Sequence, residues 1–393
     1  CMYCRVWGAA HANQISNLEK RKFAISVFEF WERSNMFCNS LTKKLSSSLL
    51  LSSSCHIRRS FASKVSALSL NSKKRKGKKI TMVTAYDFPS AAHVARAGID
   101  MILVGDSVAM VELGHETTQN VSIDTMIHHC QSVKKGIELA ESGSMLVGDM
   151  PFGTYEYEDT DVALRNAYRF VKDAGCDAVK LEGGSIHRAR TAQKIIEGGV
   201  AVMGHVGLTP QAISVIGGFR AQGRTAVRAR QLLDEALRLQ DAGCFSVVLE
   251  CVPGNVAAAI TETLEIPTIG IGAGGGTSGQ VLVFHDMLGM LSHPHHQQFV
   301  PKFCKKYAQV GHSIQDGLNQ FKSEVESGVF PGDAYSPYVM SEGEKGNFDA
   351  LLESDAEERK RKHDVAAAKL SQADEYETLK LYGANNNGSK KGE

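Results

Sequence analysis

Short apolar runs alternate with amphipathic stretches through the middle of the chain, from about residue 79 to residue 338. Runs of this length, without the polar alternation of a half-exposed strand, are typical of strands buried on both faces of a parallel sheet. The seven clearest runs, with a weaker eighth, are Ile80–Ala85, Met101–Val104, Met145–Val147, Ala178–Leu181, Ala201–Met203, Ser246–Leu249, Thr268–Ile271 and Val281–Phe284.

The stretches between these runs show helical spacing of their apolar residues. The clearest are Ile123–Ala140, Asp161–Ala174 and Ala226–Ala242. The second and third stop at Gly175 and Gly243, and a glycine directly after a periodic run predicts the end of a helix.

Strand–helix alternation of this kind predicts βα units around a parallel sheet. Eight units between 79 and 338 match a (β/α)8 TIM barrel, which commonly takes about 250 residues. A doubly wound open sheet is the alternative. No GxGxxG turn follows the first predicted strand, which disfavours a dinucleotide-binding fold.

The segment before the barrel, residues 1–78, has the composition of an organellar targeting sequence. From Met36 to Tyr86 there is no Asp or Glu, and the stretch is rich in serine and basic residues. We expect a mitochondrial (matrix) transit peptide and linker without stable structure, with Arg58–Ser63 resembling a processing site and Met36 a possible start. A disordered basic tail is the alternative, and the cluster Lys73–Lys79 is read as a basic linker.

Residues 339–393 carry alternating charges, and we expect a partly helical, charged tail with a solvated helix from about Ala350 to Leu381.

The formal net charge of +1 gives no reason to expect a nucleic-acid partner. No apolar stretch reaches the roughly 18 residues of a membrane span, so no membrane partner is expected. The nine cysteines are scattered, which fits reduced thiols.

Ionisable residues stand at the carboxyl ends of several predicted strands, where active sites of such barrels lie. They are Asp106 with Ser107, Asp149, the pair Lys180 and Glu182, His205, and Glu250. Residues two apart on a strand face the same side, so Lys180 and Glu182 should point together into the barrel mouth.

Asp106, Asp149 and Glu182 come from successive strands and predict a cluster of oxygen ligands. Placed together, three carboxylates raise one another's pKa, and a divalent cation removes that cost. Mg²⁺ suits a few carboxylates plus water and substrate oxygens. For Asp106 or Asp149 taken singly, a helix cap or a salt bridge is an equally good interpretation.

A metal beside a lysine, with a further glutamate, suits the enolisation of a 2-keto acid. The metal would polarise the keto oxygen, and Lys180 would meet negative charge on the substrate. Glu250 lies two strands away from the carboxylate cluster and is the candidate general base. His205 could orient Glu250 or move a proton, or it could be an ordinary buried histidine.

Several segments resemble the ketopantoate hydroxymethyltransferase (3-methyl-2-oxobutanoate hydroxymethyltransferase) family, in its plant-type form, from about Lys79 to Pro337. They are TMVTAYDFPSA (81–91), ILVGDSVAMVELGHETT (102–118), GDMPFGTYE (148–156), VKLEGG (179–184), GHVGLTPQ (204–211), LECVP (249–253) and IPTIGIGAG (266–274). Departures from the family pattern are Glu197–Ala201 and the run Gly274–Gly276, and neither touches the candidate site residues.

The resemblance implies an enzyme with a (β/α)8 barrel, assembled as a homo-oligomer, often a decamer; the C-terminal helical extension is expected from the charge pattern of the tail. It implies Mg²⁺ at Asp106, Asp149 and Glu182, with the keto acid at Asp106, Ser107, Asp149 and Lys180. It makes Glu250 the proton acceptor. The implied reaction transfers a hydroxymethyl group from 5,10-methylenetetrahydrofolate to 3-methyl-2-oxobutanoate, giving 2-dehydropantoate for pantothenate biosynthesis; the motifs place no folate contact.

Two alternatives remain open from the sequence. One is another metal-dependent barrel acting on keto acids, of the isocitrate lyase type. The chain lacks the KKCGH-like loop typical of that group. The other is a catalytically inactive scaffold barrel, which the intact acidic residues at the strand ends disfavour.

Overall fold

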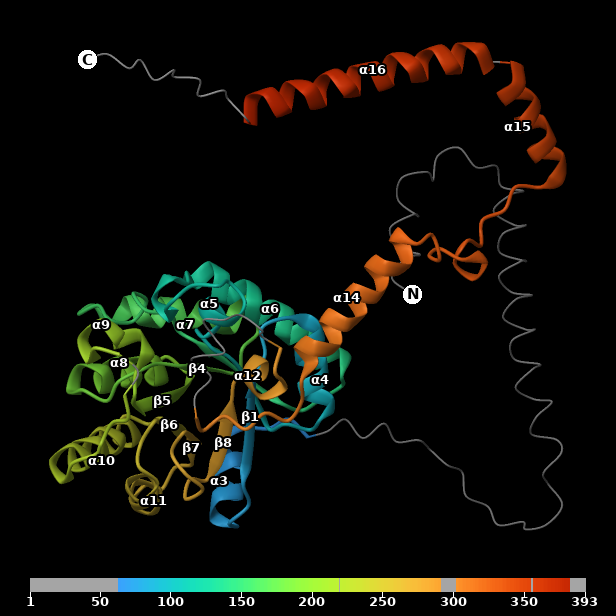
Figure 1. The fold of residues 1–393 in the computed structure, drawn as a ribbon. Helices are drawn as coiled ribbons and strands as arrows, with labels where there is room; N and C mark the ends of the chain where they lie inside the picture. Colours follow the sequence, from blue (N-terminus) through green and yellow to red (C-terminus); the bar gives the residue numbers. More distant parts are fainter. Residues whose placement is uncertain (1–62, 219, 291–301, 355, 382–393) are drawn as a thin grey trace, which may run out of the picture. The chain divides into compact units, whose positions relative to one another are not determined.

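Eight parallel strands close into a barrel (Figure 1). The structure is a computed structural model, and it describes residues 63–218, 220–290, 302–354 and 356–381. The strands are β1 (Ile80–Thr84), β2 (Met101–Val104), β3 (Met145–Asp149), β4 (Ala178–Lys180), β5 (Ala201–Gly207), β6 (Ser246–Glu250), β7 (Thr268–Ile271) and β8 (Gly279–Leu282). The predicted (β/α)8 fold class is confirmed.

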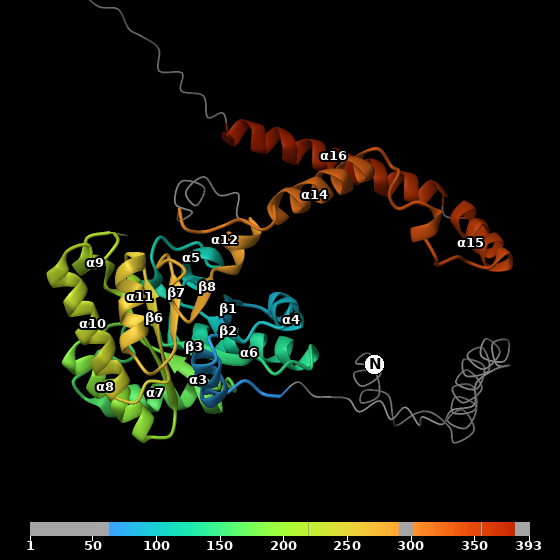
Figure 2. The ribbon, with the colours of Figure 1, turned by 90° about the horizontal axis from the view of Figure 1, so that it is seen from below.

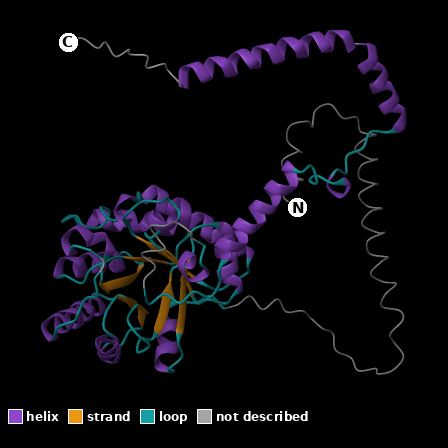
Figure 3. Ribbon diagram, viewed as in Figure 1, coloured by secondary structure: helices purple, strands orange, loops and turns teal. Residues whose placement is uncertain are grey.

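Helices surround the strands (Figure 3). In chain order they are α4 (Phe88–Arg96), α5 (Val108–Val111), α6 (Ile123–Leu139), α7 (Thr160–Lys172), α8 (Ile186–Glu197), α9 (Ile213–Ile216), α10 (Ala226–Asp241), α11 (Gly254–Thr263) and α12 (Phe284–Leu288). Two short 3-10 helices lie among them, η1 (Thr118–Asn120) and η2 (Pro210–Ala212). The three predicted helices are confirmed as α6, α7 and α10. Gly243, which follows the C-cap of α10, has a φ of 96°, as a helix-terminating glycine should.

The strands bury both of their faces, which explains why the sequence shows continuous apolar runs. On β2, Met101 and Leu103 belong to the cluster that fills the barrel interior. Ile102 and Val104 point the other way and pack in the layer between strands and helices. Each strand thus contributes alternate residues to two cores, as the period of two requires.

The parallel arrangement brings the carboxyl ends of all strands to one rim of the barrel. Neighbouring strands are in register there, with Asp149 of β3 opposite Lys180 of β4. Gly207 of β5 lies opposite Glu250 of β6. A Cβ atom at Gly207 would lie 2.3 Å from the backbone oxygen of Glu250, so only glycine fits at this point of the rim.

The segment just before β1 differs from the expectation of a linker without structure. Residues 67–75 form a capped helix, α3 (Ala67–Arg75), at the start of the strands (Figure 2). Leu70 on this helix is fully buried and packs with the barrel-interior residues Ile80, Met101 and Met145. The predicted boundary at residue 78 is therefore wrong for residues 63–78, because one apolar side chain closes the amino-terminal end of the barrel.

The basic residues of α3 and the following turn explain why this segment looked like a linker. Lys74 Nζ donates to three backbone oxygens, those of Thr261 at 2.9 Å, Leu264 at 2.5 Å and Ile266 at 2.9 Å. Lys73 pairs with Asp100. These lysines bond to the base of the barrel, so their charge serves to dock the helix.

The eighth strand begins earlier than predicted. It runs from Gly279 to Leu282, and Phe284 already starts α12. A Cβ atom at Gly279 would lie 2.4 Å from the backbone oxygen of Ile80, so β1 and β8 approach closely at a residue without a side chain. Glycine carries no apolar signal, which is why the pattern placed this strand two residues late.

After the barrel come α14 (Val310–Glu326), the 3-10 helix η3 (Asp333–Tyr335), α15 (Glu342–Ser354) and α16 (Ala356–Leu381). In place of the expected single helix from about 350 to 381 there are two helices, and the first of them begins earlier, at Glu342. Among the described helices, none combines the length and apolar character that a membrane span requires. The predicted processing site, Met36 and most of the predicted transit peptide lie outside the described residues, as does the end of the charged tail.

Replacing Leu70 with alanine should lower the free energy of unfolding by about 2–5 kcal/mol, because it leaves a cavity at the base of the barrel. The matched control is Leu68→Ala on the same helix, since Leu68 is 83% exposed. That control should change stability by no more than about 0.5 kcal/mol. Urea unfolding of both variants measures the difference, and equal effects would contradict a docked α3.

Candidate active site

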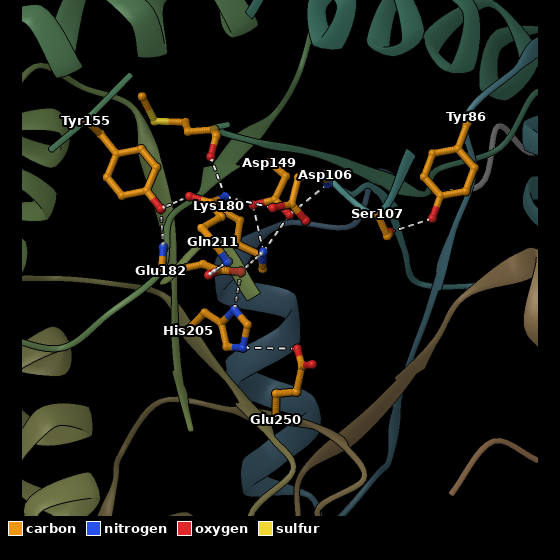
Figure 4. Close-up of polar contacts among 11 residues, drawn as sticks. Tyr86, Asp106, Ser107, Asp149, Tyr155, Lys180, Glu182, His205, Gln211 and Glu250 are labelled. Atoms are coloured by element: carbon orange, nitrogen blue, oxygen red, sulfur yellow. Dashed lines mark hydrogen bonds and ion pairs between the residues drawn. The ribbon is translucent and has the colours of Figure 1, made fainter. Parts of the chain in front are cut away.

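The acidic residues predicted at strand ends converge on the carboxyl rim of the barrel (Figure 4). Asp149 ends β3, Glu250 ends β6, and Asp106 and Glu182 lie two residues beyond β2 and β4. Asp106, Asp149 and Glu182 are all buried, Asp149 being only 1% exposed. Buried charges of one sign need compensation, so the partners of these groups determine what the site can do.

Lys180 supplies the first compensating charge. Its Nζ donates to Asp149 Oδ1 at 2.7 Å and Oδ2 at 2.5 Å. The same Nζ lies 3.9 Å from Glu182 Oε1, so the prediction that Lys180 and Glu182 face one way is confirmed. Burial by itself would lower the pKa of Lys180, but the surrounding carboxylates raise it above its ordinary value, and the side chain is a cation.

Asp106 and Asp149 are coupled through the backbone. The Asp106 N–H donates to Asp149 Oδ2 at 3.2 Å. Burial, followed by the charges of Asp149 and Glu182, raises the pKa of Asp106 well above its ordinary value. Burial also raises the pKa of Asp149, although Lys180 opposes this. The rim therefore holds more negative charge than Lys180 neutralises.

His205 lies between two glutamates, two residues before the end of β5, and is itself buried. Its Nδ1 is 3.2 Å from Glu182 Oε1, and its Nε2 is 3.2 Å from Glu250 Oε2. Neither contact has hydrogen-bond alignment, so both are ion-pair contacts. Burial opposes protonation, yet the two glutamates raise the pKa of His205 to about 9. Burial would likewise raise the pKa of Glu182, but His205 and Lys180 hold it below its ordinary value.

Glu250 differs from the other carboxylates in its exposure. Its side chain is 17% exposed, so a ligand in the barrel mouth can reach it. Cys251, the next residue, has a φ of 51°, which turns the chain sharply at the strand end. His205 separates Glu250 from the Asp106–Asp149–Lys180 group. Glu250 can therefore have a chemical role separate from that of the cluster.

Ser107 pairs with a residue that the sequence had not singled out. Its hydroxyl is 2.7 Å from the hydroxyl of Tyr86, which is fully buried after β1. Burial raises the pKa of Tyr86 above its ordinary value, so this phenol keeps its proton. The Ser107 side chain makes no capping bond to α5 and stays directed by Tyr86.

Two further residues, Gln211 and Tyr155, were missed as site residues. Both are buried, and both contact Glu182. They occur in the motifs GHVGLTPQ and GDMPFGTYE, but neither residue type carries charge, so the search for ionisable strand ends passed over them. Only their position in those motifs could have indicated a role.

Across the described residues, no three Asp, Glu, His or Cys side chains are arranged as a ready-made metal site. The donor set nevertheless suits a hard cation. Asp106 and Asp149 are buried oxygen ligands whose mutual repulsion a divalent ion would relieve. Both oxygens of Glu182 already have partners, because Oε2 accepts the Gln211 N–H and Oε1 lies beside His205. Glu182 therefore offers a cation its negative charge but no unpartnered oxygen.

Residues 64–333 match the family model of ketopantoate hydroxymethyltransferase. The match includes α3, which places the start of the similarity before the predicted Lys79. The 3-methyl-2-oxobutanoate hydroxymethyltransferase 1, mitochondrial, of Oryza sativa subsp. japonica is 52% identical over 311 residues, which cover 79% of this chain and 84% of the relative. The Arabidopsis thaliana protein of the same name is 55% identical, covering 72% of this chain and 81% of the relative.

A bacterial 3-methyl-2-oxobutanoate hydroxymethyltransferase, from Heliobacterium modesticaldum, is 47% identical and covers 72% of this chain and 99% of the relative. Similarity to the solved phosphoenolpyruvate phosphomutase of Streptomyces platensis subsp. rosaceus is far lower, at 13% identity and a TM-score of 0.43 over 75% of this chain and 98% of that one. The chain therefore belongs to the ketopantoate hydroxymethyltransferase family of enzymes.

Proposed function

We propose that this enzyme transfers a hydroxymethyl group from 5,10-methylenetetrahydrofolate to 3-methyl-2-oxobutanoate, forming 2-dehydropantoate for pantothenate biosynthesis. The names of the relatives support the reaction. The observation that carries the mechanism is the separation of two groups at the rim. A carboxylate–lysine cluster lies on one side of His205, and the reachable Glu250 lies on the other.

Asp106 and Asp149 would hold Mg²⁺, with Glu182 contributing charge nearby and contacting the ion most readily through water. Mg²⁺ commonly takes one or two carboxylates and keeps several waters, which suits two free carboxylates and one engaged one. When bound, the ion polarises a 2-keto group and stabilises negative charge on its oxygen.

Lys180 and Ser107 complete the keto acid site in this proposal, together with Asp106 and Asp149. Lys180 places a fixed positive charge beside the position of an anionic substrate. Tyr86 holds the Ser107 hydroxyl in place, so this group can direct a hydrogen bond to the substrate.

Glu250 would remove the proton from C3 of the keto acid. It is reachable from the barrel mouth, and His205 keeps positive charge beside it. In this arrangement His205 orients the Glu250 carboxylate and links it to Glu182. The carbon that loses the proton then accepts the one-carbon unit; overall, water supplies the oxygen of the hydroxymethyl group and tetrahydrofolate is released.

Two further parts of the proposal concern the whole protein. Mitochondrial import is supported by the serine-rich, acid-free stretch before the barrel and by plant relatives named mitochondrial. A homo-oligomer, decameric by family resemblance, is supported by an exposed apolar stripe along α14. The stripe consists of Ile314, Leu318, Phe321 and Val325.

The full chain with Mg²⁺ should exchange the C3 proton of 3-methyl-2-oxobutanoate for deuterium in heavy water without any folate. Enolisation precedes transfer in this mechanism, so it needs only the metal, Lys180 and Glu250. Proton NMR follows the loss of the C3 signal, and a chelator should stop it. Folded enzyme that leaves the signal unchanged would show that the enolisation mechanism is wrong.

The variant Glu250→Gln should slow this exchange by about 100-fold or more, since it removes the base. It should still bind the keto acid, because the Asp106–Lys180 side of the rim is intact. Glu262→Gln, on the exposed surface of α11, is the matched control and should exchange normally. Retained exchange in Glu250→Gln would remove Glu250 from the role of base.

His205 should make stability depend on pH. Its pKa is raised to about 9 from an ordinary value near 6.5, so its contribution is fully present below pH ~6.5 and is lost as the pH rises through about 9. Urea unfolding at pH 6.5 and at pH 9.5 measures how far the free energy of unfolding falls between the two pH values. This fall should be larger in wild type than in His205→Asn, by up to about 3 kcal/mol. The exposed His128→Asn should behave as wild type, and equal drops in all three would refute a protonated His205.

A further inference from the structure

Gln211 occupies the centre of the rim although it carries no charge. It lies in η2, directly after β5, and its side chain is only 2% exposed. From there it reaches residues that follow three other strands, Asp106 after β2, Met150 after β3 and Glu182 after β4 (Figure 4).

Every hydrogen-bonding atom of the Gln211 side chain is used. Nε2 donates to Asp106 Oδ2 at 2.9 Å and to the Met150 backbone oxygen at 3.0 Å. Oε1 accepts a hydrogen bond from the Tyr155 hydroxyl. The backbone N–H of Gln211 donates to Glu182 Oε2 at 3.0 Å. One residue thus ties one oxygen of each of two acidic side chains.

Tyr155 fixes the direction of the Gln211 amide. Its hydroxyl oxygen accepts the Glu182 N–H at 3.1 Å, so the hydroxyl proton points to Gln211 Oε1. A flipped amide would set its own oxygen against two acceptors, Asp106 Oδ2 and the Met150 oxygen. Arg188 holds Tyr155 in place, with its guanidinium 4.3 Å from the ring centre and a 2.8 Å bond to the Tyr155 backbone oxygen.

The orientation of Asp106 follows from this lock. Among the hydrogen bonds within the described residues, the one that reaches the Asp106 carboxylate comes from Gln211 and ends on Oδ2. The other oxygen, Oδ1, is left to a ligand. One oxygen of Glu182 is fixed in a similar way, because its Oε2 accepts the backbone N–H of Gln211.

We propose that Gln211, locked by Tyr155, is a positioning residue that presents one oxygen of Asp106 to Mg²⁺ and keeps Glu182 turned toward Lys180 and His205. This inference rests on the proposed function, because it assigns Asp106 to the metal. Gln211 touches neither substrate nor metal and acts through the two carboxylates.

The test uses the full chain and the variant Gln211→Met, which keeps the length of the side chain and removes its hydrogen bonds. Isothermal titration with Mg²⁺ should show about 10- to 100-fold weaker binding, the loss that a hydrogen bond to a charged group represents. The C3 exchange rate at saturating Mg²⁺ should fall about 10-fold, with a smaller change in the KM for keto acid.

Gln119→Met is the matched control. Gln119 Nε2 donates to the Gln211 backbone oxygen at 2.8 Å, so this variant loses a bond in the same loop without touching a carboxylate. Its Mg²⁺ affinity should stay within about threefold of wild type. Equal weakening in both variants would mean that Gln211 only holds the loop, and unchanged affinity in folded Gln211→Met would likewise overturn the proposal.

Tyr155→Phe is the second variant, and it decides the question if Gln211→Met does not fold. It removes the hydrogen bond from the Tyr155 hydroxyl that orients the Gln211 amide, and it should weaken Mg²⁺ binding by about 3- to 10-fold. A Tyr155→Phe variant with wild-type Mg²⁺ affinity would overturn the proposal. Wild-type enzyme that binds Mg²⁺ but fails to exchange would defeat the proposed mechanism alone, since the affinity comparison stands by itself. Wild-type enzyme that binds no Mg²⁺ would defeat both.

Discussion

The site depends on one constraint, which is that the carboxylates of Asp106, Asp149 and Glu182 share a buried rim with two cations, Lys180 and His205. Asp149 is paired with Lys180, whereas burial, followed by the charges of Asp149 and Glu182, raises the pKa of Asp106 well above its ordinary value. Burial makes such an excess of negative charge costly, so the rim is stable only with a proton or a cation among its carboxylates. Under the proposed function, a divalent metal would supply the missing positive charge, and the keto acid would bind to it.

The buried charges at the rim are separated from the apolar interior that stabilises the barrel. Its interior below the rim is apolar, and α3 closes the far end with Leu70 and three lysine-to-backbone bonds. The rim is then stabilised locally, by Gln211 and Tyr155 on one side and by His205 on the other. This division lets the loops of the rim carry chemistry without loosening the barrel.

The sequence predicted what depends on short-range pattern. Strand positions followed from continuous apolar runs, and the shared direction of Lys180 and Glu182 followed from the period of two. It did not predict α3, because that helix buries one apolar residue among many basic ones. Nor did it predict Gln211, whose contact with Asp106 joins residues 105 positions apart. Uncharged residues acquire such roles only through the closure of the barrel, which no local pattern encodes.

The melting temperature of the full chain with and without Mg²⁺, in wild type and in Asp106→Asn, tests the central claim most directly. If excess negative charge at the rim calls for a cation, Mg²⁺ raises the melting temperature of wild type. The variant, which removes one charge yet keeps an acceptor for Gln211, should be at least as stable as wild type without Mg²⁺ and should lose the Mg²⁺ effect. A wild type indifferent to Mg²⁺, or a variant less stable than metal-free wild type, would contradict the account.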